Sequence, residues 1–238
     1  MSIADIVTRG AGELGFAMSP TAITAFERYY EYLADQSRVM NLTAISGETD
    51  TAQLHFLDSL AVLRECISPG AHRIIDIGSG AGFPGLPMKI AVPEIELTLL
   101  DAQQKRVDFL LALCEKLDIA GVTCLHARAE EAAREPEMRG AFDVACSRAV
   151  ARLNVLCELC LPFVRPGGAF IALKSTESDT EIEEAQSAIA RLGAALEAIK
   201  DYRIPGTEVV HRAVIIRKTG ETADAYPRRF AKIQKSPL

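Results

Sequence analysis

From residue 73 onward, short β-rich runs alternate with helical segments, and this alternation restricts the chain to few folds. The five runs are RIIDI, IELTLLD, VTCLHA, FDVACS and GAFIALK. Strands connected through helices lie parallel in one sheet with helices on both faces. Two further runs, ALEAIKDYRI and EVVHRAVIIRK, are separated by only a few residues around Pro205 and Gly206. Such a gap permits a hairpin but no parallel crossover, so we expect the last two strands to be antiparallel.

The segment before residue 70 has a helical pattern. Pro20 suits the first turn of a helix, and apolar residues recur at helical spacing between Thr51 and Cys66. An acidic helix is expected over residues 178–193. With 238 residues and 49% hydrophobic content, the chain can bury a large core without disulfides or a structural metal. We predict an α/β fold divided into an N-terminal helical cap (1–70), a main domain (71–225) and a basic C-terminal tail (226–238).

The loop after the first strand, in RIIDIGSGAGFPGLP, contains two overlapping glycine signatures. Gly80, Gly82 and Gly85 form the G-x-G-x-x-G of a dinucleotide-binding turn, which favours NAD. A register that begins at Gly78 and continues through Gly80 favours S-adenosylmethionine instead. The carboxylate of Asp76 would repel a diphosphate but could attract the ammonium and sulfonium groups of S-adenosylmethionine. We therefore favour the register from Gly78 and predict cofactor contacts at Asp76, Gly78 and Gly80.

Acidic residues follow the next two strands. Asp101 ends the second strand, about twenty residues after the glycine loop, where it could accept the ribose hydroxyls of either cofactor class. It could equally cap the helix that begins QQKRVDFLL. Ala129 and Glu130 follow the third strand, close to where such a fold places adenine, although a lone Glu130 is more often a solvated helix-start acid. Pro84 suits the first turn of the helix after the glycine loop.

Several motifs outside the glycine loop are more specific. They are MNLTAI (40–45), HFLDSL (55–60), DIGSGAGFPGLP (76–87), LLDAQQKRVDFL (99–110) and SRAVA (147–151). On these motifs, nearly the whole chain resembles the bacterial 16S ribosomal RNA guanine-N7 methyltransferases called RsmG or GidB. The tail departs from the family's Y-P-R-x-x-G-x-P pattern at Ala231 and Ile233. This departure leaves the conformation of the tail open.

The resemblance implies a fold, an activity and a site. The fold is the Rossmann-like S-adenosylmethionine-dependent methyltransferase fold, with a seven-stranded, mostly parallel sheet, an antiparallel final strand pair and an N-terminal helical extension. The activity is methylation of N7 of guanine 527, in the standard rRNA numbering, of 16S ribosomal RNA in the small ribosomal subunit. The cofactor contacts implied are Gly78, Phe83, Ala129, Glu130 and Arg148.

The residue types agree with attack by guanine N7. The loop after the fourth strand reads SRAVA, not the Asn/Asp-Pro-Pro-aromatic motif used on exocyclic amines, and no Pro-Cys pair supplies a nucleophile for C5 methylation. Guanine N7 carries an exposed lone pair and attacks without losing a proton, so we predict no general base. Catalysis would consist mostly of aligning N7, the methyl carbon and the sulfur. Arg148 would position the cofactor or the guanine; the alternative is a surface ion pair.

The net charge of −6 opposes RNA binding unless the positive charge is segregated. Residues 1–70 hold nine acids against four Lys or Arg, whereas the last thirteen residues hold four bases and no acid. We predict phosphate contacts by the tail and by one lysine that ends the fifth strand, namely Arg228, Arg229, Lys232, Lys235 and Lys174. From charge alone, a solvated tail is the alternative. The small footprint predicts weak affinity for isolated RNA, so the substrate is expected to be 16S rRNA within a small-subunit particle.

The six cysteines lie in apolar periodic segments without the spacing of a disulfide framework, which suits a reducing compartment. Cys157 and Cys160 form a C-x-x-C, but no second pair or nearby histidine completes a zinc site, so we expect core residues and no metal. No basic leader or run of about 18 apolar residues is present. We therefore expect a cytoplasmic protein without membrane contacts.

Some alternatives stay open at this point. His55 and Asp58, one helical turn apart, could form a local hydrogen-bonded pair or border the cofactor pocket. Three rival functions are a small-molecule methyltransferase, a dinucleotide oxidoreductase and a non-catalytic RNA-binding module. The fold alone does not distinguish a small-molecule methyltransferase from an RNA methyltransferase, because function depends on the residues of the site. The sequence does not indicate the oligomeric state.

Overall fold

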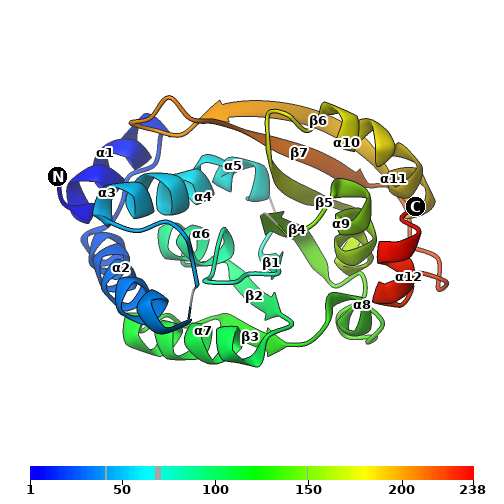
Figure 1. The fold of residues 1–238 in the computed structure, drawn as a ribbon, viewed down its shortest axis with the longest axis horizontal. Helices are drawn as coiled ribbons and strands as arrows, with labels where there is room; N and C mark the ends of the chain where they lie inside the picture. Colours follow the sequence, from blue (N-terminus) through cyan, green and yellow to red (C-terminus); the bar gives the residue numbers. More distant parts are fainter. Residues whose placement is uncertain (41, 68–70, 149) are drawn as a thin grey trace.

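The computed structural model describes residues 1–40, 42–67, 71–148 and 150–238 and contains a seven-stranded sheet in the order β3-β2-β1-β4-β5-β7-β6 (Figure 1). The first five strands pair in parallel, and β7 pairs antiparallel with both β5 and β6. The predicted sheet and its antiparallel ending are confirmed. The strands are β1 (Arg73–Ile77), β2 (Glu96–Asp101), β3 (Val122–His126), β4 (Phe142–Arg148), β5 (Val164–Ser175), β6 (Ala194–Arg203) and β7 (Val210–Lys218).

Helices cover both faces of the sheet because side chains alternate between the faces along each strand. Ile74 and Cys146 point into one core, and their neighbours Ile75 and Ala145 point into the other. The first core is covered by α1 (Ile3–Glu13), α2 (Pro20–Met40), a π-helix (Ala52–Leu57), α4 (Asp58–Ala61), α5 (Leu63–Cys66), α6 (Gly85–Ala91) and α7 (Gln104–Leu117). The short α3 (Glu48–Thr51) packs on the π-helix and α1. The second is covered by α8 (Ala129–Ala132), α9 (Leu153–Cys160), a 3-10 turn (Leu161–Phe163), α10 (Asp179–Glu184), α11 (Gln186–Arg191) and α12 (Phe230–Lys235).

Two N-terminal helices begin at local start signals, and Pro20 is the one that the sequence pattern predicts. Ser2 and Asp5 form a reciprocal capping box at α1, and Pro20 is the first residue of α2. The acidic helix is interrupted at Ala185 and forms α10 and α11. Pro84 precedes α6 as its N-cap and does not lie in its first turn as expected. None of the helices formed by the described residues is long and apolar enough to cross a membrane.

Three positions of the sequence predictions fall outside the described residues. Asn41 belongs to the MNLTAI motif, Ala149 to SRAVA, and residues 68–70 adjoin the boundary predicted between the cap and the main domain. The cap helices and one face of the sheet contribute to the same hydrophobic core. The division at residues 70 and 225 stays a prediction.

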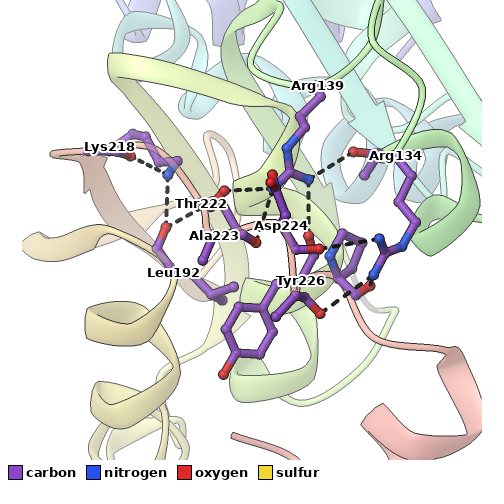
Figure 2. A network of polar contacts seen from close by, with 12 residues as sticks. Arg134, Arg139, Leu192, Lys218, Thr222, Ala223, Asp224 and Tyr226 are labelled. Atoms are coloured by element: carbon purple, nitrogen blue, oxygen red, sulfur yellow. Dashed lines mark hydrogen bonds and ion pairs between the residues drawn. The ribbon is translucent and has the colours of Figure 1, made fainter.

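The chain after β7 is held by two arginines that lie between α8 and β4 (Figure 2). Arg139 donates to three carbonyl groups, and Arg134 donates to three others, between Thr222 and Pro227. Nearby, the buried ammonium of Lys218 donates to the carbonyls of Leu192 and Gly220. Backbone acceptors in a segment without secondary structure are thereby satisfied by side chains.

The basic tail packs onto the protein, unlike the solvated tail that charge alone suggests. Ile233 of α12 is fully buried in the second core, beside α9. The guanidinium of Arg228 meets the buried carboxylate of Glu158 at 2.6 Å. Arg229, Lys232 and Lys235 stay exposed. The tail thus has an anchored inner side and a basic outer side.

Candidate functional site

The glycine loop leaves the carboxyl end of β1 and leads into α6. Gly78 and Gly80 have φ angles of 74° and 59°, in the left-handed region that favours glycine. The N–H of Gly78 donates to the Leu100 carbonyl over 2.8 Å, which ties the loop to the end of β2. The hydroxyl of Ser79 donates to the Asp76 carbonyl over 2.8 Å. The loop is therefore a fixed turn whose first residues lie at the carboxyl ends of the parallel strands.

The glycines of this loop divide into two groups. A Cβ on Gly82 would lie 2.6 Å from the Tyr29 hydroxyl, and one on Gly85 would lie 2.9 Å from a carboxylate oxygen of Asp76. These two glycines are required by internal packing. Gly78 and Gly80 line a cavity, and a Cβ on Gly78 would also lie 2.5 Å from the Val150 side chain. The register that begins at Gly78 is thus the one that borders the cavity.

The cavity has a volume of about 440 Å³ and lies at the carboxyl ends of the parallel strands, where ligands bind in open α/β sheets. One wall is the glycine loop, and the cap, β4, β5 and β7 supply the rest. Besides loop residues 78–81 and Phe83, the lining residues are Leu42, Thr43, Ile45, Leu54, His55, Asp58, Arg148, Leu173, Lys174, Ser175 and His211.

Arg148, the last residue of β4, connects the parts of this cavity. Its guanidinium donates to Asp58 at 2.8 Å and to the Leu54 carbonyl at 3.3 Å, and it lies 3.0 Å from Nδ1 of His55. Its central carbon lies 4.9 Å from the centre of the Phe83 ring, within range of a cation–π interaction. Only 16% of the side chain is exposed, so the alternative of a surface ion pair is wrong. The ion pair is buried, inside the cavity wall.

His55 is held as a neutral imidazole. Arginine cannot accept a hydrogen bond, so Nδ1 of His55 must accept from Arg148, and the ring proton lies on Nε2. That proton is donated to the Thr43 hydroxyl over 2.8 Å. Burial, reinforced by the charge of Arg148, lowers the pKa of His55 to about 3. The ring stacks on Phe83 with centroids 4.4 Å apart, so His55 forms a rigid part of the wall.

Asp58 is the anionic centre of the cluster. One of its oxygens accepts from Arg148, and the other accepts from Nδ1 of His211 at 2.8 Å and from the Tyr202 hydroxyl at 2.9 Å. Burial alone would raise the pKa of Asp58, but the hydrogen bond from His211 and the charge of Arg148 outweigh it and lower the pKa. His55 and Asp58 thus both border the cavity, and each bonds Arg148 in place of the local pair considered from the sequence.

Two acids expected at the cofactor lie behind the cavity surface. Asp76 is fully buried; one oxygen accepts from the Gly85 N–H at 2.8 Å, and the other has no partner among the described residues. Burial raises the pKa of Asp76 to about 7. Asp101 accepts from the N–H groups of Gly80 at 3.0 Å and Gln103 at 2.9 Å. Gln103 is the N-cap residue of α7, so Asp101 binds a backbone N–H just outside the helix, and both its capping role and its ribose role stay predictions.

The remaining predicted residues lie elsewhere or have partners. Ala129 and Glu130 begin α8 and are buried, so Glu130 is not a solvated acid. Glu130 lines a separate cavity together with Arg228 and Arg229, so the structure does not bring it together with Gly78. Lys174 lines the first cavity, but its ammonium donates to Glu181 and to the Ala151 carbonyl. The side chains of Arg228 and Lys174 are thus already paired within the protein.

Sequence reasoning missed His211, Tyr202 and Thr43. His211 and Asp58 are 153 residues apart, and their contact depends on β7 returning beside β5. No local spacing could have indicated this pairing. Cys157 and Cys160 are fully buried, as expected for core residues, whereas Cys114 and Cys124 are only partly buried.

Comparison with known proteins identifies the family. The family model described as GidB, rRNA small subunit methyltransferase G, matches residues 22–210. This chain belongs to the GidB family. A ribosomal RNA small subunit methyltransferase G from Thermoanaerobacter sp. (strain X514) is 41% identical over 234 residues, covering 98% of each chain. Its counterpart from Clostridium botulinum (strain Eklund 17B / Type B) is 39% identical over 238 residues, covering 100% of both.

Two solved structures with bound SAH or AdoMet have a similar fold. An O-methyltransferase from Bacillus cereus in complex with SAH covers 79% of this chain and 90% of its own, with a TM-score of 0.57 and 17% identity. The TYW2 protein of M. jannaschii in complex with AdoMet has a TM-score of 0.51 and 13% identity, and the match covers 67% of this chain and 74% of that one. The predicted family and methyltransferase fold are confirmed, and with them the prediction of an enzyme.

Proposed function

We propose that this chain transfers the methyl group of S-adenosylmethionine to N7 of a guanine in 16S ribosomal RNA, guanine 527 in the standard rRNA numbering. The observation that carries the proposal is the cavity at the carboxyl ends of the strands, where the glycine loop faces Arg148 in a chain of the GidB family. Relatives of full length are named ribosomal RNA small subunit methyltransferase G. We also propose a cytoplasmic location, because the proposed substrate is ribosomal RNA.

The cavity fits the proposed cofactor. Gly78 and Gly80 have no side chains, so their backbone can approach the amino-acid part of S-adenosylmethionine. Phe83 and Arg148 lie against each other in the cavity wall, and Asp76 is buried beneath the loop, where burial raises its pKa to about 7. We propose that Asp101, Ala129 and Glu130 extend the site along β2 and β3 toward the nucleoside. When bound, S-adenosylmethionine supplies a methyl group on a positively charged sulfur.

The protein's own groups would align the reaction without removing a proton. The Nδ1 lone pair of His55 is committed to Arg148, and both oxygens of Asp58 accept hydrogen bonds. Neither group is free to act as a general base, and N7 requires none. Arg148, the proposed positioning group, is fixed by Asp58 and His55 and holds its geometry before the substrate arrives.

We propose that the RNA is held by the outer side of the tail. Arg229, Lys232 and Lys235 are exposed and can meet phosphates. Arg228 and Lys174 act mainly within the protein, because each already has a carboxylate partner. With a net charge of −6 and few free cations in the tail, recognition would require the folded small-subunit particle.

The decisive experiment supplies isotopically labelled S-adenosylmethionine and small ribosomal subunits that lack this modification, and then maps the label. We expect transfer to N7 of one guanine. Label on another atom, or no transfer to 16S rRNA, would reject the proposal. Calorimetry with NAD in place of S-adenosylmethionine tests the oxidoreductase alternative, and NAD binding in the cavity would favour it.

A further inference from the structure

His211 presents an imidazole nitrogen to the cavity. It is the second residue of β7, opposite Ser175 of β5, and 34% of its side chain is exposed. Its Nδ1 is bonded to Asp58 at 2.8 Å. The described part of the chain offers Nε2 no hydrogen-bond partner, although the ring lines the cavity. This nitrogen is therefore available to a ligand.

The surroundings of His211 favour its charged form. Asp58 on α4 accepts its Nδ1 proton and also binds Arg148 of β4 and Tyr202 of β6, whose ring meets His211 edge-on at 6.3 Å. The hydrogen bond to Asp58 raises the pKa of His211 against the opposing effects of burial and Arg148. The other titratable groups of the cavity are neutral His55 and Lys174, which is paired with Glu181. Asp58 is thus shared between Arg148 and His211, and its contact with His211 favours the charged imidazole.

The position of His211 in the sheet separates it from the proposed cofactor site. The glycine loop, Asp101 and Glu130 follow β1, β2 and β3, which lie on one side of β4. β5 and β7 lie on the other side of β4, so His211 faces the glycine loop across the cavity. A methyl group held at the glycine loop would be approached from the β5 and β7 side. That side offers the attacking base a polar group across the cavity from the glycine loop.

We propose that His211 is the residue that positions the target base, donating a hydrogen bond from Nε2 to O6 of the guanine whose N7 is methylated. This inference rests on the proposed function. O6 lies beside N7 on the same edge of guanine and accepts hydrogen bonds. A donor at O6 fixes this edge toward the methyl group and leaves the lone pair of N7 free. Asp58 acts through His211 by accepting the hydrogen bond from its Nδ1–H, so that Nε2 carries the proton donated to the base.

The same contact distinguishes guanine from adenine. Adenine carries an amino group where guanine carries O6, so charged His211 would face a second donor and leave it unpaired. Neutral His211 would keep its proton on Nδ1 for Asp58 and present an acceptor from Nε2. Recognition of guanine would therefore weaken as the pH rises through the pKa of His211.

The test compares wild type with His211→Ala and His211→Arg, using unmodified small subunits and labelled S-adenosylmethionine between pH 6 and pH 9. His72→Ala is the matched control, since His72 is exposed just before β1, at the opposite end of the strands. We expect His211→Ala to raise KM for the subunits about 10-fold or more, the usual effect of losing a hydrogen bond from a charged donor. His211→Arg, which cannot be deprotonated, should restore much of the affinity and remove the alkaline rise in KM. The affinity for S-adenosylmethionine, measured by calorimetry, should stay unchanged in both variants.

Other outcomes would overturn the inference. An unchanged KM for His211→Ala, or a parallel loss of cofactor affinity, would place His211 outside the base site. A wild-type KM that does not vary with pH, while ring ¹⁵N NMR shows His211 titrating in that range, would also contradict it. If wild type labels no guanine N7, the proposed function fails first. If wild type labels N7 and His211→Ala behaves like His72→Ala, only this inference fails.

Discussion

The pairing of Arg228 with Glu158 gives the most direct test of how the tail is attached. The Arg228 side chain makes three bonds to the carboxylate, at 2.9, 3.1 and 2.6 Å, and the Glu158 side chain is completely buried. Arg228→Met removes these bonds and leaves a buried charge without its counterion. Breaking one partner of such a pair costs about 3–5 kcal/mol. This cost cannot exceed the free energy needed to release the tail, because release would let water reach Glu158.

Urea denaturation followed by circular dichroism measures the change in the free energy of unfolding. Glu158→Gln keeps an acceptor for the Arg228 N–H, which lies 2.7 Å from Oε1, and should cost about 1–3 kcal/mol. The double variant should be more stable than Arg228→Met alone, because no unpaired charge remains. Arg229→Met, at the exposed neighbouring position, should stay within about 0.5 kcal/mol of wild type. A cost for Arg228→Met equal to that of Arg229→Met, or simple additivity in the double variant, would refute the reasoning.

Three further predictions concern the site and the tail. Gly78→Ala should lower the affinity for S-adenosylmethionine in calorimetry, because its Cβ would lie 2.5 Å from Val150 in a left-handed backbone; Gly12→Ala, with nothing within 4 Å, is the control that should not. The free energy of unfolding of wild type should fall as the pH rises from about 4 to about 7, because Asp76 has a pKa of about 7 in the folded protein and the ordinary value of 3.8 in the unfolded chain. Asp76→Asn should remove this fall. Urea midpoints that differ from wild type by the same amount at both pH values would contradict this. Replacing the exposed tail bases Arg229, Lys232 and Lys235 together by Gln should raise KM for the subunits. The slope of log K against log salt should become less steep by about 2, because each lost phosphate contact contributes about 0.7. An unchanged slope would exclude these bases from the RNA contact. This replacement is preferable to deleting residues 226–238, because deletion would also remove the buried Ile233.

The fold was predictable because its signals are local or depend on connection length. The alternation from residue 73 gives the parallel strands, and the short gap at Pro205 and Gly206 gives the antiparallel pair. Pro20 marks a helix start where the local rule places it. Pro84 precedes its helix by one residue, and it follows two loop residues, Gly82 and Phe83, that lie against Tyr29.

The site was only partly predictable. Glycine spacing identified the loop, and Arg148 was found through motif resemblance, but their surroundings depend on contacts between distant segments. Arg148 is buried by a cap helix that precedes it by more than 80 residues, which no charge count could show. Asp76 looked like a cofactor contact because it precedes Gly78, yet its side chain points beneath the loop toward Gly85.

The sequence by itself determined the type of sheet, the family and the loop that begins at Gly78, since each follows from period, spacing or motif. Only the tertiary structure decided which side chains meet. The strand order brings His211 to Asp58 from 153 residues away, and the packing of the tail assigns Arg228 to Glu158 and leaves Arg229 exposed. The physical reason is that hydrogen bonding, burial and charge depend on distance in space. The separation of residues along the chain does not fix that distance.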